Sequence, residues 1–226
     1  MEGGRFSIMH RMSGWSNPAL NSSPRMRLCL LLTRDLCRND PLQVLRDAVA
    51  GGVDSVQLRE KEMADDDFLQ WAKIVKNECD ELRVPLIIND RVEVAAELGA
   101  AGVHLGKEDM PLHEARKLLA PGQWIGLTTH SLDELEDAAD QGADYVGFGP
   151  MFATPLKPNL RPQSADDVTR AVLFARVPVL AIGGITPENV ESVPSKFGLA
   201  VSSAICAKKD SKMAAMQLRH RNQFHT

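Results

Sequence analysis

Long apolar segments, paired cysteines and an excess of positive charge are all missing from this sequence. No apolar run approaches the ~18 residues of a membrane-spanning helix, and residues 1–24 contain no apolar core of a secretion signal. The four cysteines form no CxxC motif, which argues against a zinc site and favours free thiols in a reducing cytoplasm. The net charge is −4 with both signs interspersed, so we expect neither nucleic acid nor a membrane as a partner. Any bound anion must be held locally.

Length and composition fit one globular domain. Of the 226 residues, 44% are hydrophobic and 25% are charged, which is enough apolar material for a single substantial core. Residues 1–25 are rich in Ser, Asn, Gly and Met and are expected to form a disordered N-terminal extension. Residues 26–226 are expected to form the domain, and whether it assembles into a homo-oligomer stays open.

Short apolar runs alternate with helix signals along the whole domain. The runs are apolar nearly throughout, which is typical of parallel strands buried on both faces. They lie at 27–33, 53–59, 84–90, 102–106, 124–129, 145–150, 177–183 and 199–205. Eight strand–helix repeats predict a (β/α)8 TIM barrel. An open doubly wound sheet is the alternative, but the first strand is not followed by the GxGxxG turn that such sheets often carry.

Several signals mark helices between these strands. Asp40-Pro41 and Thr186-Pro187 each combine a capping residue with proline in the first turn, and Ser131 forms a capping box with Glu134. Residues 65–82 have the apolar spacing of one long amphipathic helix. The helix expected at 187–197 is short.

The second strand ends in three long polar side chains, Gln57, Arg59 and Lys61. Their spacing of two residues places them on one face of a strand. The C-terminal ends of barrel strands form the active-site mouth, so this group of donors predicts an anion-binding site there.

Carboxylates follow the third and fourth strands. Asp90 and Asp109 are expected to share a Mg²⁺ ion, which typically takes one or two carboxylates together with waters and phosphate oxygens. Lys157, after the sixth strand, would add positive charge beside the cations of the second strand. Helix capping is the alternative for both aspartates, with Asp90 paired to Arg91.

A second anion site is predicted at the seventh and eighth strands. Gly183 and Gly184 would let the backbone approach a phosphate closely, and Ser203 on the eighth strand would add a hydroxyl. A tight turn without a ligand is the alternative for the glycine pair. Two phosphate sites, one of them linked to a metal, suggest two phosphorylated small-molecule substrates.

No nucleophile stands out in the sequence. It contains no Ser–His–Asp order, no activated cysteine and no buried Schiff-base lysine. His104 lies in an apolar strand and is expected to be a hydrogen-bonded core histidine, and His130 directly precedes the helix cap at Ser131. Such a site would stabilise a leaving anion rather than attack the substrate.

With these residues in place, the chain resembles the thiamine phosphate synthase family. The resemblance runs from about residue 27 to residue 206, and the motifs are specific because they occur together and in order. The matching segments are VQLREK (56–61), NDRVEVAAELGAAGVHLGKED (89–109), GLTTHS (126–131), ADYVGFGPMFATPLK (143–157), PVLAIGGITPENV (178–190) and VSSAI (201–205).

The resemblance implies a transferase that joins hydroxymethylpyrimidine diphosphate to thiazole phosphate or its carboxylate and releases pyrophosphate. The implied mechanism is dissociative: pyrophosphate leaves first, a pyrimidine cation forms, and the thiazole nitrogen captures it. By this resemblance Asp90 and Asp109 hold Mg²⁺. The implied substrate-binding residues are Gln57, Arg59, Lys61, Asn89, Thr128, Thr154, Lys157, Gly183, Gly184 and Ser203, and Arg59, Lys61 and Lys157 also serve catalysis.

Two departures from the family keep alternatives open. Leu156 stands where the family usually has a second Thr or Ser, and the segment before the eighth strand lacks the usual Ala-Gly-Ala-Asp. One alternative is a relative like thiazole tautomerase, in which a histidine near the fifth strand end, such as His130, transfers protons. The other is a non-catalytic barrel that binds thiazole phosphate. The intact aspartate pair and the QLREK segment favour the synthase.

Overall fold

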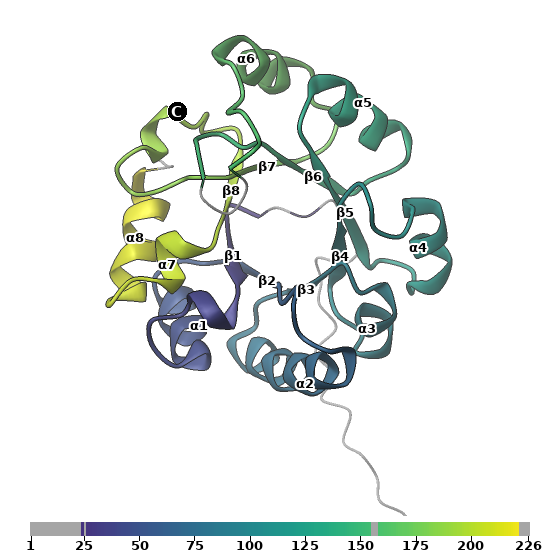
Figure 1. Cartoon of the computed structure of the whole chain (residues 1–226), viewed down its shortest axis with the longest axis vertical. Coiled ribbons are helices and arrows are strands. Elements are labelled where there is room, and N and C mark those ends of the chain that lie inside the picture. Colours follow the sequence, from purple (N-terminus) through teal and green to yellow (C-terminus); the bar gives the residue numbers. More distant parts are fainter. Residues whose placement is uncertain (1–23, 25, 155–157, 222–226) are drawn as a thin grey trace, which may run out of the picture.

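The computed structural model describes residues 24, 26–154 and 158–221, and eight parallel strands close into one barrel. Neighbours in sequence are neighbours in the sheet, and β1 also pairs with β8. Figure 1 shows the strands surrounded by an outer ring of helices. The predicted (β/α)8 barrel is confirmed. The strands are β1 (Leu28–Leu32), β2 (Ser55–Leu58), β3 (Leu86–Asn89), β4 (Gly102–Leu105), β5 (Trp124–Thr129), β6 (Tyr145–Phe148), β7 (Val179–Ile182) and β8 (Gly198–Val201).

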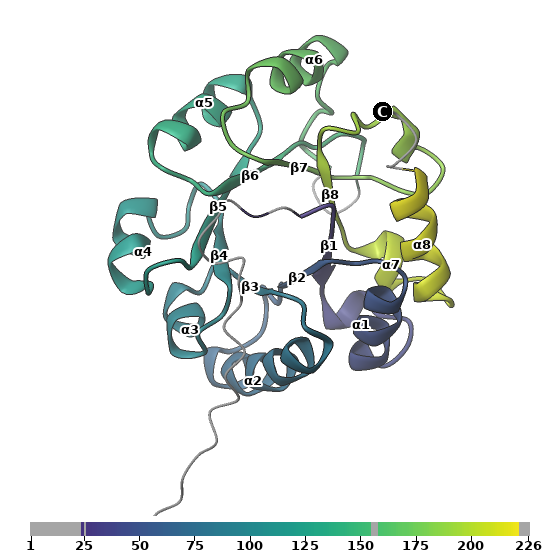
Figure 2. The same cartoon turned by 180° about the vertical axis from the view of Figure 1, so that it is seen from behind.

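Helices follow most strands, and the ring they form is visible from both sides of the barrel (Figures 1 and 2). They are α1 (Pro41–Ala50), α2 (Asp65–Leu82), α3 (Val92–Glu97), α4 (Leu112–Leu118), α5 (Leu132–Asp140), α6 (Ala165–Phe174), α7 (Ser203–Cys206) and α8 (Ser211–Arg221), with 3-10 turns η2 (Arg34–Leu36) and η3 (Val190–Ser192). The long predicted helix at 65–82 is confirmed as α2. Within the described residues, no helix combines the length and apolar character needed to cross a membrane.

Side-chain caps explain where two of these helices begin. Asp40 accepts a hydrogen bond from the Gln43 backbone N–H at 3.0 Å and so caps α1, as predicted. Ser131 accepts from the Glu134 N–H at 3.2 Å and caps α5. The Glu134 carboxylate accepts in return from the backbone N–H of His130, one residue before the usual partner in a capping box.

The helix predicted at 187–197 is wrong. Between β7 and β8 the described chain contains only the 3-10 turn η3. The Asn189 side chain accepts from the Thr186 backbone N–H at 2.8 Å and donates to the Gly184 carbonyl at 2.9 Å. These bonds hold the turn at its start, where the Val190 N–H also donates to the Thr186 carbonyl, and the described chain continues only as far as η3.

The placement of Ser203 on the eighth strand is also wrong. Strand β8 ends at Val201, and Ser203 is the first residue of helix α7, where it is exposed. The apolar run continues through Ile205 because α7 is short and buries its remaining residues. A short buried helix and a buried strand cannot be told apart from apolar character alone.

Alternate residues of the strands build two separate apolar clusters. Outward-facing side chains such as Leu30, Ile88 and Val146 pack against the helices. Inward-facing side chains fill one end of the barrel, including Ile87, Trp124, Tyr145 and Leu180. Gly126 makes room for this inner cluster, since a Cβ atom there would lie 2.1 Å from the Tyr145 ring. The remaining interior, toward the C-terminal strand ends, is left for a cavity.

Candidate active site

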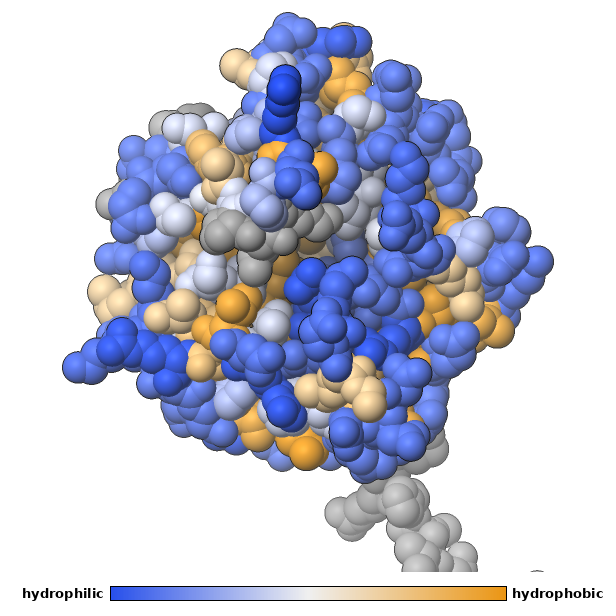
Figure 3. Space-filling view, in the orientation of Figure 1, coloured by the Kyte–Doolittle hydropathy of each residue, from blue (hydrophilic) through white to orange (hydrophobic). Residues whose placement is uncertain are grey.

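A cavity of about 370 Å³ lies at the C-terminal ends of the strands. Its lining combines apolar side chains at the inner end with polar and charged ones around them. Figure 3 shows the barrel in the orientation of Figure 1, where hydrophilic side chains predominate on the visible face. Most of the predicted site residues line this cavity: Gln57, Arg59, Lys61, Asn89, Asp90, Asp109, Thr128, Thr154 and Gly183.

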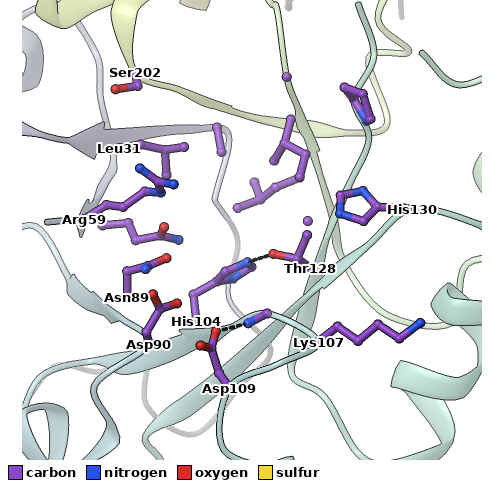
Figure 4. Close-up of a pocket in the computed structure, with 18 of the residues that line it drawn as sticks. Leu31, Arg59, Asn89, Asp90, His104, Lys107, Asp109, Thr128, His130 and Ser202 are labelled. Atoms are coloured by element: carbon purple, nitrogen blue, oxygen red, sulfur yellow. Dashed lines mark hydrogen bonds between the residues drawn. The ribbon is translucent and has the colours of Figure 1, made fainter. Parts of the chain in front are cut away.

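One strand position and the loop after it bring the predicted donors of the second strand together. Gln57 faces the barrel interior from β2 and is buried. Arg59 and Lys61 follow the end of the strand and line the same cavity, and Arg59 is fixed by a backbone bond to Leu32. Figure 4 shows Arg59, Asn89 and Asp90 along one wall. The predicted group of donors is therefore present, although only its first member belongs to a strand.

The two aspartates form a close carboxylate pair. Asp90 has a left-handed backbone with φ of 64°, and its N–H donates to the His104 carbonyl across the strand ends. Burial raises the pKa of Asp90, and the neighbouring Asp109 carboxylate raises it further, while Lys61 lowers it. The Lys61 ammonium lies 3.4 Å from an Asp90 carboxylate oxygen. The left-handed backbone of Asp90 therefore places its carboxylate beside that of Asp109 in the cavity lining.

Helix capping, the alternative considered for both aspartates, is not what the structure contains. The residue before α3 is Arg91, with no side-chain cap, and the residue before α4 is Pro111. The Asp109 carboxylate instead accepts from the backbone N–H of Gly106 at 2.6 Å, which turns it toward the cavity (Figure 4).

The carboxylate pair fits a hard divalent cation. Among the described residues no group of three or more His, Cys, Asp or Glu side chains is placed to hold a metal ion, so a closed protein cage is absent from that part of the chain. Mg²⁺ usually keeps several waters and needs only one or two carboxylates. Two adjacent carboxylates, one of which has its pKa raised by burial and by the other, are the donor set that such an ion would neutralise.

Arg91 holds the loop that carries Lys61, a role that sequence reasoning missed. Its guanidinium donates to the carbonyls of Glu60 and Met63 at 3.0 and 2.7 Å, and to the Asp65 carboxylate at 2.9 Å. It also lies over the Phe68 ring, 4.2 Å from the centroid. These partners are distant in sequence, so only the fold brings them together.

The glycine pair has the backbone geometry that requires glycine. Gly183 and Gly184 have φ of 86° and 67°, and a Cβ atom at Gly184 would lie 2.6 Å from the Ala153 carbonyl. Gly183 lines the cavity, whereas Gly184 is not among its lining residues. Ser202, rather than Ser203, contributes to the lining. Lys157 and Leu156 lie outside the described residues.

Both histidines near the strand ends line the cavity. His104 is buried and hydrogen-bonded through both ring nitrogens, as expected for a core histidine, but it also faces the cavity. The His130 Nδ1 lies 2.6 Å from the Gly149 carbonyl, which it bonds as a donor. That bond gives His130 the local structural role considered from sequence, and leaves its Nε2 for other contacts.

A family model, several relatives in sequence and one solved structure carry the same description. A family model described as thiamine monophosphate synthase matches residues 28–205. A thiamine-phosphate synthase of Coprothermobacter proteolyticus is 40% identical over 198 residues, which cover 86% of this chain and 94% of that protein. One from Albidiferax ferrireducens is 44% identical over 179 residues, covering 78% and 82%. The solved thiamine phosphate pyrophosphorylase from Pyrococcus furiosus has a TM-score of 0.79 and 32% identity, covering 88% of this chain and 96% of that one.

Proposed function

This chain belongs to the thiamine monophosphate synthase family and is a transferase enzyme, and on that premise we propose the reaction it catalyses. It joins hydroxymethylpyrimidine diphosphate to thiazole phosphate or its carboxylate, giving thiamine phosphate and pyrophosphate. The observation that carries this proposal is the shared wall of β2, β3 and β4. There, anion-binding donors and a carboxylate pair face one cavity, which suits a diphosphate bound together with a cation.

Asp90 and Asp109 are the residues that would hold Mg²⁺. The raised pKa of Asp90, caused by burial and by the Asp109 carboxylate, is the kind of electrostatic cost that a bound cation relieves. When bound, the ion supplies charge neutralisation for the oxygens of a diphosphate leaving group. The Lys61 ammonium, 3.4 Å from Asp90 and half exposed at its side chain, is placed to exchange its carboxylate partner for a diphosphate oxygen.

The other residues of this wall bind and orient the diphosphate substrate. Arg59 and Lys61 provide charge-assisted donors to the diphosphate, and Lys157 is proposed to add a third. These charges stabilise pyrophosphate as it departs, which favours a dissociative route in which the C–O bond breaks before the new C–N bond forms. Gln57, Asn89, Thr128 and Thr154 are proposed to bind the pyrimidine substrate.

The opposite wall is proposed to hold the thiazole phosphate. Backbone near Gly183 and Gly184 can approach a phosphate because neither residue has a side chain. Ser202 lines the cavity and Ser203 does not, so Ser202 is proposed to take the phosphate-binding role expected for Ser203. The apolar lining beside it, Leu180, Ile182 and Ala200, suits the two aromatic rings that must meet.

One assay separates this proposal from its alternatives. Purified protein is incubated with both substrates and Mg²⁺, and thiamine phosphate and pyrophosphate are quantified by chromatography. We expect equal amounts of both products, none when either substrate is omitted, and a strong loss with EDTA. Isomerisation of the thiazole substrate alone would instead support a tautomerase. Calorimetric binding of thiazole phosphate with no turnover would support a non-catalytic binding protein, and either result would refute the synthase.

A further inference from the structure

One guanidinium ties the loop after β2 to the end of β3. Each of the three side-chain nitrogens of Arg91 donates a hydrogen bond to this loop or to the start of α2 behind it. Nε bonds the Asp65 carboxylate at 2.9 Å, and the two terminal nitrogens bond the carbonyls of Glu60 and Met63 at 3.0 and 2.7 Å. These two carbonyls lie on either side of Lys61 in the chain, so the guanidinium braces the backbone that carries it.

The loop has few backbone bonds of its own. Within the described residues, no backbone N–H of residues 61–64 donates to a backbone carbonyl. The side chain of Lys61 is half exposed and lies 3.4 Å from Asp90, an ion pair that a bound anion would disturb. The place of Lys61 therefore depends on the bonds made to the residues beside it.

Arg91 is committed to these partners and is not free to bind a ligand. It is not among the residues that line the cavity. Its side chain is only 19% exposed, and its guanidinium lies over the Phe68 ring, 4.2 Å from the centroid. A planar guanidinium with all three nitrogens bonded is held in one orientation. Its effect on an anion in the cavity must pass through the loop that it braces.

We propose that Arg91 is a positioning residue that holds the Lys61 ammonium where the diphosphate of the substrate binds. This inference rests on the proposed function, because the diphosphate is the anion that Lys61 is proposed to contact. A cation on an unbraced loop must be ordered when the anion binds, which weakens binding. The brace orders the loop beforehand, so less of that cost remains. Thiazole phosphate, proposed to bind at the opposite wall, should not depend on Arg91.

Arg91→Lys tests the brace and keeps the positive charge, because a lysine ammonium cannot reproduce the fork of the guanidinium. Pyrophosphate with Mg²⁺ is the calorimetric probe, since its binding needs no turnover. We expect its affinity to fall roughly tenfold in Arg91→Lys. In the synthase assay the KM for the diphosphate should rise by a similar factor, with the KM for thiazole phosphate within about twofold. Wild-type pyrophosphate affinity in Arg91→Lys would overturn the proposal.

A double-mutant cycle with Lys61→Ala separates positioning from a general structural effect. If Arg91 acts through Lys61, Arg91→Lys should weaken pyrophosphate binding by less than about twofold once residue 61 is alanine. An equal loss in both backgrounds would overturn the proposal. Pyrophosphate affinity that is unchanged in Lys61→Ala would overturn it as well, because the braced cation would then contribute nothing to the anion site.

Arg116→Lys is the matched control. Arg116 also donates to two backbone carbonyls and one aspartate, those of Gln123, Gly142 and Asp144, but it braces segments that precede β5 and β6 and does not line the cavity. This substitution removes a similar fork elsewhere in the fold, and pyrophosphate affinity should stay within about twofold of the wild type. A loss as large as that in Arg91→Lys would overturn the proposal.

Asp65→Asn replaces Arg91→Lys if the latter does not fold. The Asp65 side chain is 88% exposed, so the substitution loosens one bond of the brace and leaves the core intact. Asp66→Asn, at an exposed residue of the same turn, makes the same change in charge. We expect pyrophosphate affinity about two- to threefold lower in Asp65→Asn than in Asp66→Asn, and equal affinities would overturn the proposal. Failure of the synthase assay would leave pyrophosphate binding measurable, so the two proposals fail separately.

Discussion

The two walls of the cavity differ in what they offer a bound anion. The wall from β2 to β4 carries ionisable side chains, with Arg59, Asp90 and the neighbouring Asp109 among them. The wall from β6 to β8 offers glycine backbone and apolar side chains, with Gly183 and Ile182 as examples. Charged side chains make the charge-assisted hydrogen bonds that suit a highly charged diphosphate, whereas glycine backbone lets a phosphate approach the chain closely. We infer that the first wall serves the diphosphate that leaves and the second the phosphate that remains.

Removing one charge from the first wall should have the largest effect. Asp90→Asn keeps the shape of the side chain, and asparagine tolerates the left-handed backbone at φ of 64°. We expect turnover with Mg²⁺ to fall by about 10³-fold, because the proposed cation would lose a ligand at the step in which pyrophosphate is proposed to depart. Thiazole phosphate affinity, measured by calorimetry, should stay within about twofold, since that site is proposed to lie on the other wall.

Asp140→Asn is the control for Asp90→Asn. Asp140 is an exposed carboxylate on α5 that pairs with Arg176, so the substitution makes the same chemical change away from the cavity. It should leave turnover unchanged. Full activity in Asp90→Asn would remove the carboxylate pair from the mechanism, and a parallel loss of thiazole phosphate affinity would mean that the two walls do not act separately.

The first wall was more accessible to sequence reasoning than the second. Each barrel strand ends at the same rim, so polar residues such as Asp90 could be placed there from strand order alone. The turn before β8 was mistaken for a helix, because the Thr186-Pro187 signal indicates a helix start without showing how far the helix continues. The bracing role of Arg91 depends on partners up to 31 residues away. Local patterns specify the strands, whereas contacts between loops are set by the closed barrel.

An added methyl group in the second wall should have an intermediate effect. In Gly184→Ala the new Cβ would lie 2.6 and 2.7 Å from the carbonyls of Ala153 and Phe152. The loop after β6 must therefore shift, and we expect thiazole phosphate affinity to fall about tenfold with diphosphate affinity largely kept. Thermal unfolding should also show a loss of about 1–2 kcal/mol from the left-handed backbone.

Gly99→Ala separates strain from displacement in this experiment. Gly99 has a similar φ of 55°, but nothing lies within 4 Å of its Cβ position. We expect a comparable loss of stability with both substrate affinities intact. If Gly99→Ala weakened thiazole phosphate binding as much as Gly184→Ala, close packing of the Gly184 backbone against the loop after β6 would not be needed for that binding.

The smallest effect is expected at Glu60, which lies between the two cations of the first wall but outside the cavity lining. Its carboxylate accepts from the Arg34 backbone N–H at 2.7 Å, and burial raises its pKa above the ordinary 4.5. Between these two pKa values the folded protein binds more protons than the unfolded chain, so wild-type stability falls as pH rises through that interval.

Glu60→Gln removes this dependence because glutamine does not ionise. The melting temperature of the variant relative to the wild type should therefore increase by about 1–2 °C between pH 4 and pH 7. Glu62→Gln, an exposed residue of the same loop, controls for the loss of one negative charge. If the difference in melting temperature between Glu60→Gln and the wild type did not change with pH, burial would not be raising the pKa of Glu60. Turnover should be unaffected, because the Glu60 side chain does not line the cavity. Membership of the QLREK segment alone therefore does not place a residue against the proposed diphosphate; its side chain must also face the cavity.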